Sequence, residues 1–306
     1  MKKAGQNVNA QNILLNHNQQ ESVAGVTTEY PYSMHVTSFD PGPIPWHWHE
    51  ELEFAYVVSG TIELILADRN YIIKKNQGYF TNSNALTMTR KHEGSDTNIV
   101  HTHMFHPIFL SGHFKSIFET KYLNPIIHDK NIDALIFTGA TQNQKLILQK
   151  LLKASALQHE ENVEFQTRNL FSEIWLLLLQ EIKEQPKHTV NFQHQERLQN
   201  MLSYIHSNYN EKISLEEIAS AASVSTRECI RCFNKSISKT PGEYLMEYRL
   251  NMARKLLNDS EMSITDISYH CGFSSNAYFG KAFREKYGMT PLQYRNRNID
   301  KQDVLN

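Results

Sequence analysis

The 306-residue sequence predicts a multi-domain α+β protein, with an N-terminal antiparallel β-barrel followed by helices and then an all-α C-terminal domain. Three observations lead to this fold class. Short apolar runs broken by turn residues recur at intervals of about 8 to 12 residues in the first third of the chain. Longer stretches with helical periodicity follow them. The last hundred residues contain a pattern of about fifty residues that occurs twice.

Composition narrows the class of protein. With 40% hydrophobic and 21% charged residues, each half of the chain can bury a core, which excludes a disordered protein. The net charge of −1 excludes a uniformly basic nucleic-acid coat but allows a basic face on one domain. Three cysteines are too few for a disulfide scaffold. The first residues become polar where a signal peptide would have its apolar core, and the longest aliphatic run is too short to span a membrane. We therefore expect a cytoplasmic protein without membrane association.

The β-barrel is expected over residues 25–110. Its strand-like segments each run up to a cluster of turn residues, a spacing that is typical of an antiparallel barrel or sandwich. The segments are LEFAYVV up to Ser59-Gly60, TIELILA up to Asp68-Arg69-Asn70, YIIKK up to Asn76-Gln77-Gly78, and NIVHTHMF.

Residues 111–185 form the helical part that follows the barrel. Helical periodicity extends from Gln142 to His159 and again from Val163 to Glu184. The second helix has a broad apolar face that can pack on the barrel or against another subunit, and we expect it to mediate dimerisation. Residues 186–196 contain a proline and no periodicity, so they are expected to be the linker to the C-terminal domain.

The repeat lies within residues 197–297. Ser214-Leu215-Glu216-Glu217-Ile218-Ala219 recurs as Ser263-Ile264-Thr265-Asp266-Ile267-Ser268, and Thr240-Pro241 recurs as Thr290-Pro291. In both copies a serine at the expected N-cap is followed three residues later by an acid, a pattern that opens a short helix. A turn follows at Ala222-Ser223-Val224 or Cys271-Gly272-Phe273, and a second helix then runs to the Thr-Pro pair.

Each copy therefore has the pattern of a helix-turn-helix unit, the first over about residues 215–236 and the second over about residues 264–287. The second helix of such a unit can enter the major groove of DNA. On the exposed faces of these two reading helices, eight side chains can reach bases or phosphates: Ser225, Thr226, Arg227 and Arg231 in the first copy, and Ser275, Asn276, Lys281 and Arg284 in the second.

Other side chains of the repeat are expected in its core. Cys229 and Cys232 stand at i and i+3 on one helix face, which favours buried small hydrophobes over a redox or metal-binding pair. The apolar positions expected in the core are Leu215, Ile218, Ile264, Ile267, Tyr278, Phe279 and Phe283.

The stretch from Leu198 to Arg297 closely resembles the DNA-binding domain of the AraC/XylS family of transcription regulators. The matching residues include Ile218-Ala219, Ser225, Arg231, Phe233 and, above all, Ile267-Ser268, Cys271 to Ser275, Tyr278-Phe279, Phe283, Gly288 to Pro291 and Tyr294-Arg295. The resemblance implies two helix-turn-helix units joined by one helix. Their reading helices would enter successive major grooves on one face of double-stranded DNA, about 34 Å apart.

The N-terminal half contains a possible metal site. His47, His49, Glu53 and Gly60 reproduce the spacing of the first cupin motif, and two histidines with one carboxylate suit Fe(II) or a similar metal. The second cupin motif normally supplies another histidine, but Thr87 follows the turn that ends at Leu86. Gly42 also stands one residue closer to His47 than in the enzymatic motif.

The same stretch is similar to the cupin-type effector domain of many AraC-like regulators. We therefore expect small-molecule sensing rather than catalysis, with no cofactor and no bound metal. His47, His49 and Glu53 would line or border the mouth of a barrel pocket and hydrogen-bond a polar ligand such as a sugar. His101 and His103 could project into the same barrel. Alternatively, they are packing or surface residues, which is the interpretation that we favour. Trp46 and Trp48 could stack on a sugar ring, but are expected in the core.

Taken together, these features predict a sequence-specific DNA-binding transcription regulator that acts as a homodimer and responds to a small-molecule effector. Two alternatives remain open from the sequence. One is a metal-dependent cupin enzyme with a DNA-binding appendage, and the other is a ligand-independent dimeric DNA-binding protein. The effector, the operator and the sign of regulation are not predicted.

Overall fold

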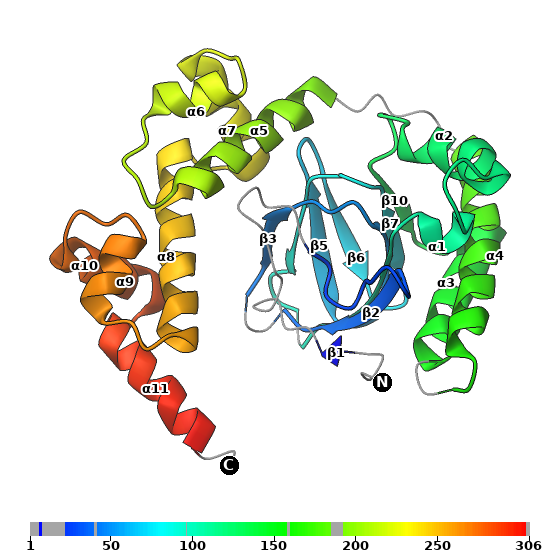
Figure 1. The fold of residues 1–306 in the computed structure, drawn as a ribbon, viewed down its shortest axis with the longest axis horizontal. Coiled ribbons are helices and arrows are strands. Elements are labelled where there is room, and N and C mark those ends of the chain that lie inside the picture. The colour runs from blue at the N-terminus through cyan, green and yellow to red at the C-terminus, as the bar shows by residue number, and fades with distance from the viewer. Residues whose placement is uncertain are drawn as a thin grey trace. The chain divides into compact units, whose positions relative to one another are not determined.

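The computed structural model describes residues 6–7, 22–39, 42–95, 97–157, 160–184 and 192–303. Figure 1 shows two units, residues 1–195 and residues 196–306. None of the helices in these ranges is both long enough and apolar enough to cross a membrane.

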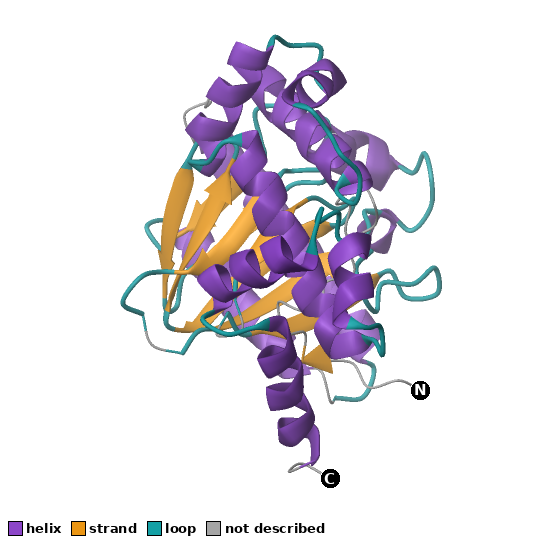
Figure 2. Cartoon of the chain, turned by 90° about the vertical axis from the view of Figure 1, so that its left-hand side faces the viewer, coloured by secondary structure: helices purple, strands orange, loops and turns teal. Residues whose placement is uncertain are grey.

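The N-terminal unit is built on two β-sheets, coloured orange in Figure 2. The larger sheet has the strand order β1-β2-β9-β4-β7-β10 and the smaller one β3-β8-β5-β6. All pairings described are antiparallel except that of β1 with β2. The strands are β1 (Gln6–Asn7), β2 (Tyr32–Thr37), β3 (Ile44–His47), β4 (Leu52–Ser59), β5 (Thr61–Leu66), β6 (Asn70–Lys74), β7 (Gly78–Thr81), β8 (Thr87–Lys91), β9 (Ile99–Phe105) and β10 (Ala134–Phe137). The predicted antiparallel β-fold is confirmed as a sandwich.

Strand β4 carries apolar side chains on both faces, because one face packs against the smaller sheet and the other against the helices. Ala55 and Val57 belong to the core between the two sheets, together with Leu64 of β5. Phe54 and Tyr56, the alternate residues, belong to the core between the larger sheet and the helices. The sandwich interior is therefore on the Ala55 side of β4, and this side also carries Glu53.

Helices cover the outer face of the larger sheet. The predicted helix over Val163 to Glu184 is confirmed as α4 (Val163–Glu184), which packs beside α3 (Gln142–Ala156), and Phe171 of α4 lies 5.1 Å from Phe105 of β9 between ring centroids. Shorter elements precede them: α1 (Ile108–Ser111), the π-helix η1 (Glu119–Leu123) and α2 (Asn124–Ile127). The sequence analysis did not predict β10, a four-residue apolar run that extends the sheet beside β7.

The C-terminal unit is helical, as predicted. Of the expected linker at 186–196, residues 186–191 lie outside the described residues, and residues 192–196 are already helical. The helices are α5 (Phe192–Asn208), α6 (Leu215–Ala221), α7 (Thr226–Ile237), α8 (Pro241–Asp259), α9 (Ile264–His270), α10 (Asn276–Tyr287) and α11 (Pro291–Asp303). In Figure 1, α8 connects the pair α6 and α7 to the pair α9 and α10.

The two turns of the repeat have equivalent geometry. Ser223 and Gly272 adopt left-handed conformations with φ of 53° and 76°. The residue after each left-handed position donates a backbone hydrogen bond to the helix before the turn, Val224 to Ala219 and Phe273 to Ser268. At Gly272 a Cβ atom would lie 2.6 Å from the carbonyl oxygen of Tyr209, so this turn requires glycine.

Candidate functional site

Serines cap both reading helices. The Ser225 hydroxyl accepts a hydrogen bond from the backbone N–H of Glu228 at the start of α7. The Ser275 hydroxyl accepts one from Tyr278 at the start of α10. Both serines were predicted to reach DNA; in this structure their hydroxyls hold the first turn of each reading helix.

Two arginines are exposed on α7. Arg231 forms a bidentate pair with Glu228, with Nε to Oε2 and Nη2 to Oε1 distances of 2.8 Å each. This pair lowers the pKa of Glu228 below its ordinary value. Arg227 is exposed and Thr226 is half-buried on the same helix. The predicted polar surface of the first reading helix is therefore present, with one of its two arginines held by a carboxylate.

The surface of α10 is polar in a different way. Asn276 donates to the Thr265 hydroxyl of α9 over 2.8 Å, which links the two helices of this unit. Lys281 lies 3.9 Å from the Glu285 carboxylate, a loose pair between exposed side chains. Arg284 is exposed. The second reading helix thus presents an amide and two cations.

Tyr278 corrects one expectation of the sequence analysis. It was expected in the core, but 49% of its surface is exposed. Phe279 and Phe283 are fully buried at i and i+4. Tyr278 precedes Phe279 by one position, which turns its side chain about 100° around the helix and onto the outer face. The position of Tyr278 relative to Phe279 and Phe283 along the helix could have predicted that its side chain is exposed.

The cysteines of α7 are core residues, as predicted. Cys229 and Cys232 are 0% and 1% exposed. Burial raises the pKa of Cys229 to about 11, so the thiol stays protonated at neutral pH.

The sandwich brings together the three predicted sensor residues. The Nε2 atom of His49 lies 3.5 Å from Oε2 of Glu53, and the rings of His47 and His49 are 5.9 Å apart between centroids. The sequence analysis missed two further members of this polar cluster, Tyr79 and Thr81 of β7. Their hydroxyls donate to Glu53 over 2.9 Å and 2.7 Å. Pairing of β7 with β4 places them there.

The polar cluster, defined as His47, His49, Glu53, Tyr79 and Thr81, holds a buried carboxylate. Burial alone would raise the pKa of Glu53, but His49 and the Thr81 hydroxyl together lower it below the ordinary value. Burial, together with the neighbouring His49, lowers the pKa of His47 to about 4. At neutral pH the cluster therefore contains an ionised Glu53 beside a neutral His47.

The donor set does not resemble a complete metal site. Thr87 lies opposite His47 in the register of β3 and β8, so the position of the missing ligand carries a hydroxyl. Both Glu53 oxygens already accept hydrogen bonds. Within the ranges that the structure describes, no group of three or more His, Cys, Asp or Glu residues is arranged to hold a metal ion.

His101 and His103, the other two histidines that the sequence analysis considered for the barrel, lie on the helix side of the larger sheet. His103 points away from the sandwich interior. On the helix side of the sheet it contacts the Tyr32 hydroxyl over 2.8 Å and the Ser155 hydroxyl over 3.1 Å. Burial lowers the pKa of His103 to about 3. His101 alternates with the interior residues Val100 and Thr102, so it too faces the helix side of the sheet. Trp46 and Trp48 are buried, as expected.

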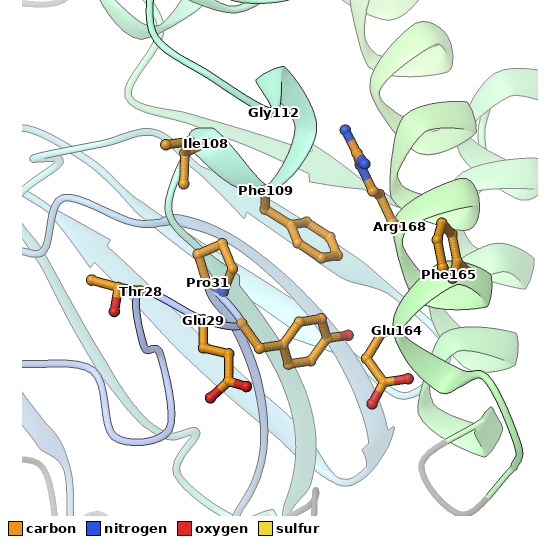
Figure 3. A pocket seen from close by; sticks show the side chains of 10 residues that line it. Thr28, Glu29, Pro31, Ile108, Phe109, Gly112, Glu164, Phe165 and Arg168 are labelled. Carbon is orange, nitrogen blue, oxygen red and sulfur yellow. The ribbon is translucent and has the colours of Figure 1, made fainter.

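A separate pocket of about 310 Å³ opens beside the first half of α4 (Figure 3). Aromatic rings form much of its wall, and Glu164 and Arg168 of α4 supply opposite charges one helical turn apart. The sequence analysis singled out none of these residues, which belong to no motif. The lining consists of Thr28, Glu29, Tyr30, Pro31, Ile108, Phe109, Gly112, Glu164, Phe165 and Arg168.

Comparisons with known proteins bear on both units. A family model described as "Helix-turn-helix domain" matches residues 218–297, and one described as "Cupin domain" matches residues 35–97. The HTH-type transcriptional regulator YdeC of Bacillus subtilis (strain 168), itself uncharacterized, is 30% identical over 292 residues, which cover 94% of this chain and 99% of YdeC.

Among solved structures, a transcriptional regulator with an AraC-type DNA-binding domain from Chromobacterium violaceum is 34% identical. The match covers 33% of this chain and 91% of that chain, with a TM-score of 0.33. ToxT from Vibrio cholerae is 15% identical over 87% of this chain and 98% of its own, with a TM-score of 0.43.

Proposed function

The chain belongs to the AraC family of helix-turn-helix transcriptional regulators with an N-terminal cupin domain. We propose that it binds a two-element operator as a homodimer and that a small molecule controls this binding. It is a DNA-binding regulator and not an enzyme. We place its action in the cytoplasm, together with the DNA that it reads.

The observation that carries this proposal is the pair of capped reading helices, α7 and α10, in one unit. Each begins at a serine cap and presents polar or cationic side chains on its outer face. Helix N-termini and exposed Arg, Asn and Lys side chains are the groups that contact phosphates and base edges in the major groove. The proposed DNA-contacting set is Ser225, Thr226, Arg227, Arg231, Ser275, Asn276, Lys281 and Arg284.

Genome-wide mapping of the binding sites tests whether the chain binds a two-element operator. The purified chain is incubated with fragments of its own genome, and bound fragments are sequenced at several salt concentrations. We expect sharp sites with two short elements one helical turn apart. Diffuse binding with only a steep salt dependence would mean that the repeat supplies phosphate affinity without sequence readout, and it would contradict the proposal.

We further propose that the polar cluster takes part in recognition of the effector. His47, His49 and Glu53 combine a carboxylate with imidazole groups in the sandwich interior, a set that can bind the hydroxyl groups of a polar ligand such as a sugar. A ligand of this kind would act by binding one arrangement of the dimer better than another.

A thermal-shift screen against a panel of common monosaccharides tests the effector. A sugar that stabilises the wild-type chain is expected to lose its effect in His49→Ala. Replacement of His128, an exposed histidine of the same unit, should leave the shift intact and serves as control. A shift that persists in His49→Ala would contradict the placement, and no shift with any metabolite would favour a ligand-independent regulator.

For dimerisation we propose the exposed side of α4. Phe165 and Leu176 are 72% and 55% exposed there, which is unusual for large apolar side chains on a helix that is otherwise packed. Sedimentation of the chain with operator DNA should show two protomers, and Leu176→Glu should weaken the assembly. Gln149→Glu, at an exposed site on α3 instead of α4, is the matched control. A wild-type chain that stays monomeric at micromolar concentration with DNA present would contradict dimerisation.

A further inference from the structure

Glu228 and Arg231 form a bidentate salt bridge, here called the fork, on the exposed face of α7. The two residues stand at i and i+3, and two hydrogen bonds join the same edge of the guanidinium, formed by Nε and Nη2, to both carboxylate oxygens. The Arg231 side chain is 75% exposed and that of Glu228 is 22% exposed. An exposed ion pair adds little to stability, so its consequence lies in orientation.

The fork leaves part of the guanidinium free. A guanidinium carries five N–H donors, of which one on Nε and one on Nη2 are used here. Both donors of Nη1 and the second donor of Nη2 remain, and they point outward from the pair. This free edge has the geometry that donates two parallel hydrogen bonds to O6 and N7 of guanine.

Arg197 of α5 places a second cation near the Glu228 carboxylate. Its Nη1 atom lies 3.6 Å from Oε1 of Glu228. With two cations close by, Glu228 stays ionised near the negatively charged DNA, where a lone carboxylate would be repelled. The fork can therefore persist when α7 enters the major groove.

Neighbouring positions lack this arrangement. Arg227 makes no hydrogen bond or ion pair with any residue in the described part of the chain, so it is free to meet a phosphate. In the second copy, fifty residues on, Lys281 stands where the first copy has Arg231, and Tyr278 stands where it has Glu228. A lysine ammonium cannot form the two parallel bonds of a guanidinium.

We propose that Glu228 is a positioning residue that presents Arg231 to a guanine base in the first operator element, and that the second element has no counterpart of this contact. The inference rests on the proposed function and deepens it. It makes the two elements of the operator unequal, because only one reading helix carries a carboxylate-held guanidinium. Loss of the carboxylate should cost sequence preference without costing phosphate contacts.

Selection from a random double-stranded DNA library tests the inference with the full chain. Wild type, Arg231→Lys and Glu228→Gln are compared, with Lys235→Arg and Glu285→Gln as matched controls on exposed sites of the two reading helices. We expect the wild type to prefer guanine at one position of one element. Both Arg231→Lys and Glu228→Gln should reduce that preference about tenfold or more, at the same position. The two controls should leave it unchanged.

A second readout separates positioning from a structural role. Affinity for unrelated DNA, measured against salt concentration, should keep its slope in Arg231→Lys, which retains the charge, and should be equal or higher in Glu228→Gln. Melting temperatures confirm that the variants fold. Retention of the guanine preference in either variant would overturn the inference alone. A wild-type chain that enriches no sequence would overturn the proposed function and this inference with it.

Discussion

Thr81 on β7 lies directly opposite Glu53 on β4, and its hydroxyl donates to the Glu53 carboxylate over 2.7 Å. Glu53 is 7% exposed and Thr81 is 1% exposed, so this hydrogen bond is shielded from water. Two residues 28 positions apart in sequence thus form the centre of the polar cluster. The register of the two strands creates the contact.

Thr81→Val should therefore destabilise the N-terminal unit. Valine has nearly the same shape but leaves one oxygen of a buried carboxylate without its donor, which costs about 1 to 3 kcal/mol of unfolding free energy. Urea unfolding at neutral pH measures the loss. A double-mutant cycle with Glu53→Gln isolates the pair, and a coupling energy near zero would show that the hydrogen bond contributes nothing.

Stability should fall on acidification because several buried histidines, His47 and His103 among them, have lowered pKa values. The folded chain holds the pKa of His47 at about 4 and that of His103 at about 3, whereas both are near 6.5 when unfolded. Between those values the unfolded chain binds more protons, so the free energy of unfolding decreases as the pH falls through 6.5 towards 4. Each histidine contributes about 1.4 kcal/mol per pH unit in that window.

Unfolding in urea at pH 7, 6 and 5 tests this dependence. His103→Gln should remove about one histidine's share of the slope, while His128→Gln, at an exposed site, should leave the slope as it is in the wild type. An unchanged slope in His103→Gln would contradict the expectation.

Arg227→Ala should weaken binding to operator and to unrelated DNA by the same factor. The residue is exposed and makes no hydrogen bond or ion pair within the described ranges, as expected for a side chain that contacts phosphate. Loss of one phosphate contact should reduce the slope of log affinity against log salt by about one. Fluorescence anisotropy at several salt concentrations measures both. A change confined to the operator would identify Arg227 as a base-reading residue instead.

Gly272→Ala should destabilise the C-terminal unit. The new Cβ would lie 2.6 Å from the Tyr209 carbonyl oxygen, at a φ of 76° that alanine rarely adopts. We expect a loss of about 1 to 3 kcal/mol in thermal or urea unfolding. Gly242→Ala is the matched control, because that site in α8 has open space around it, and it should stabilise the helix by up to about 1 kcal/mol. Equal effects at the two sites would contradict the steric argument.

Treatment with diamide should leave DNA affinity unchanged. Cys229, Cys232 and Cys271 are all at most 1% exposed, and burial raises their thiol pKa values, so thiolate is scarce. A gel-shift titration before and after oxidation checks this. An affinity change that Cys229→Ser abolishes would instead indicate a redox-sensitive pair.

Much of the fold could be predicted because its signals are local. Ser214 and Ser263 cap their helices as predicted, since a hydroxyl at the N-cap reaches a backbone N–H only three residues away. Strand β10 was missed because its four apolar residues give no period of their own. The pocket beside α4 was missed because its lining comes from three segments far apart in the chain.

The sequence by itself determined the two helix-turn-helix units, their caps and the glycine of the second turn, because each depends on residues within a few positions of one another. It also placed His47, His49 and Glu53 close together, through their short spacing. Only the tertiary structure decided that Tyr79 and Thr81 complete the polar cluster and that His103 packs against the helices. Strand register and sheet face set these contacts, and pairing between distant strands fixes both.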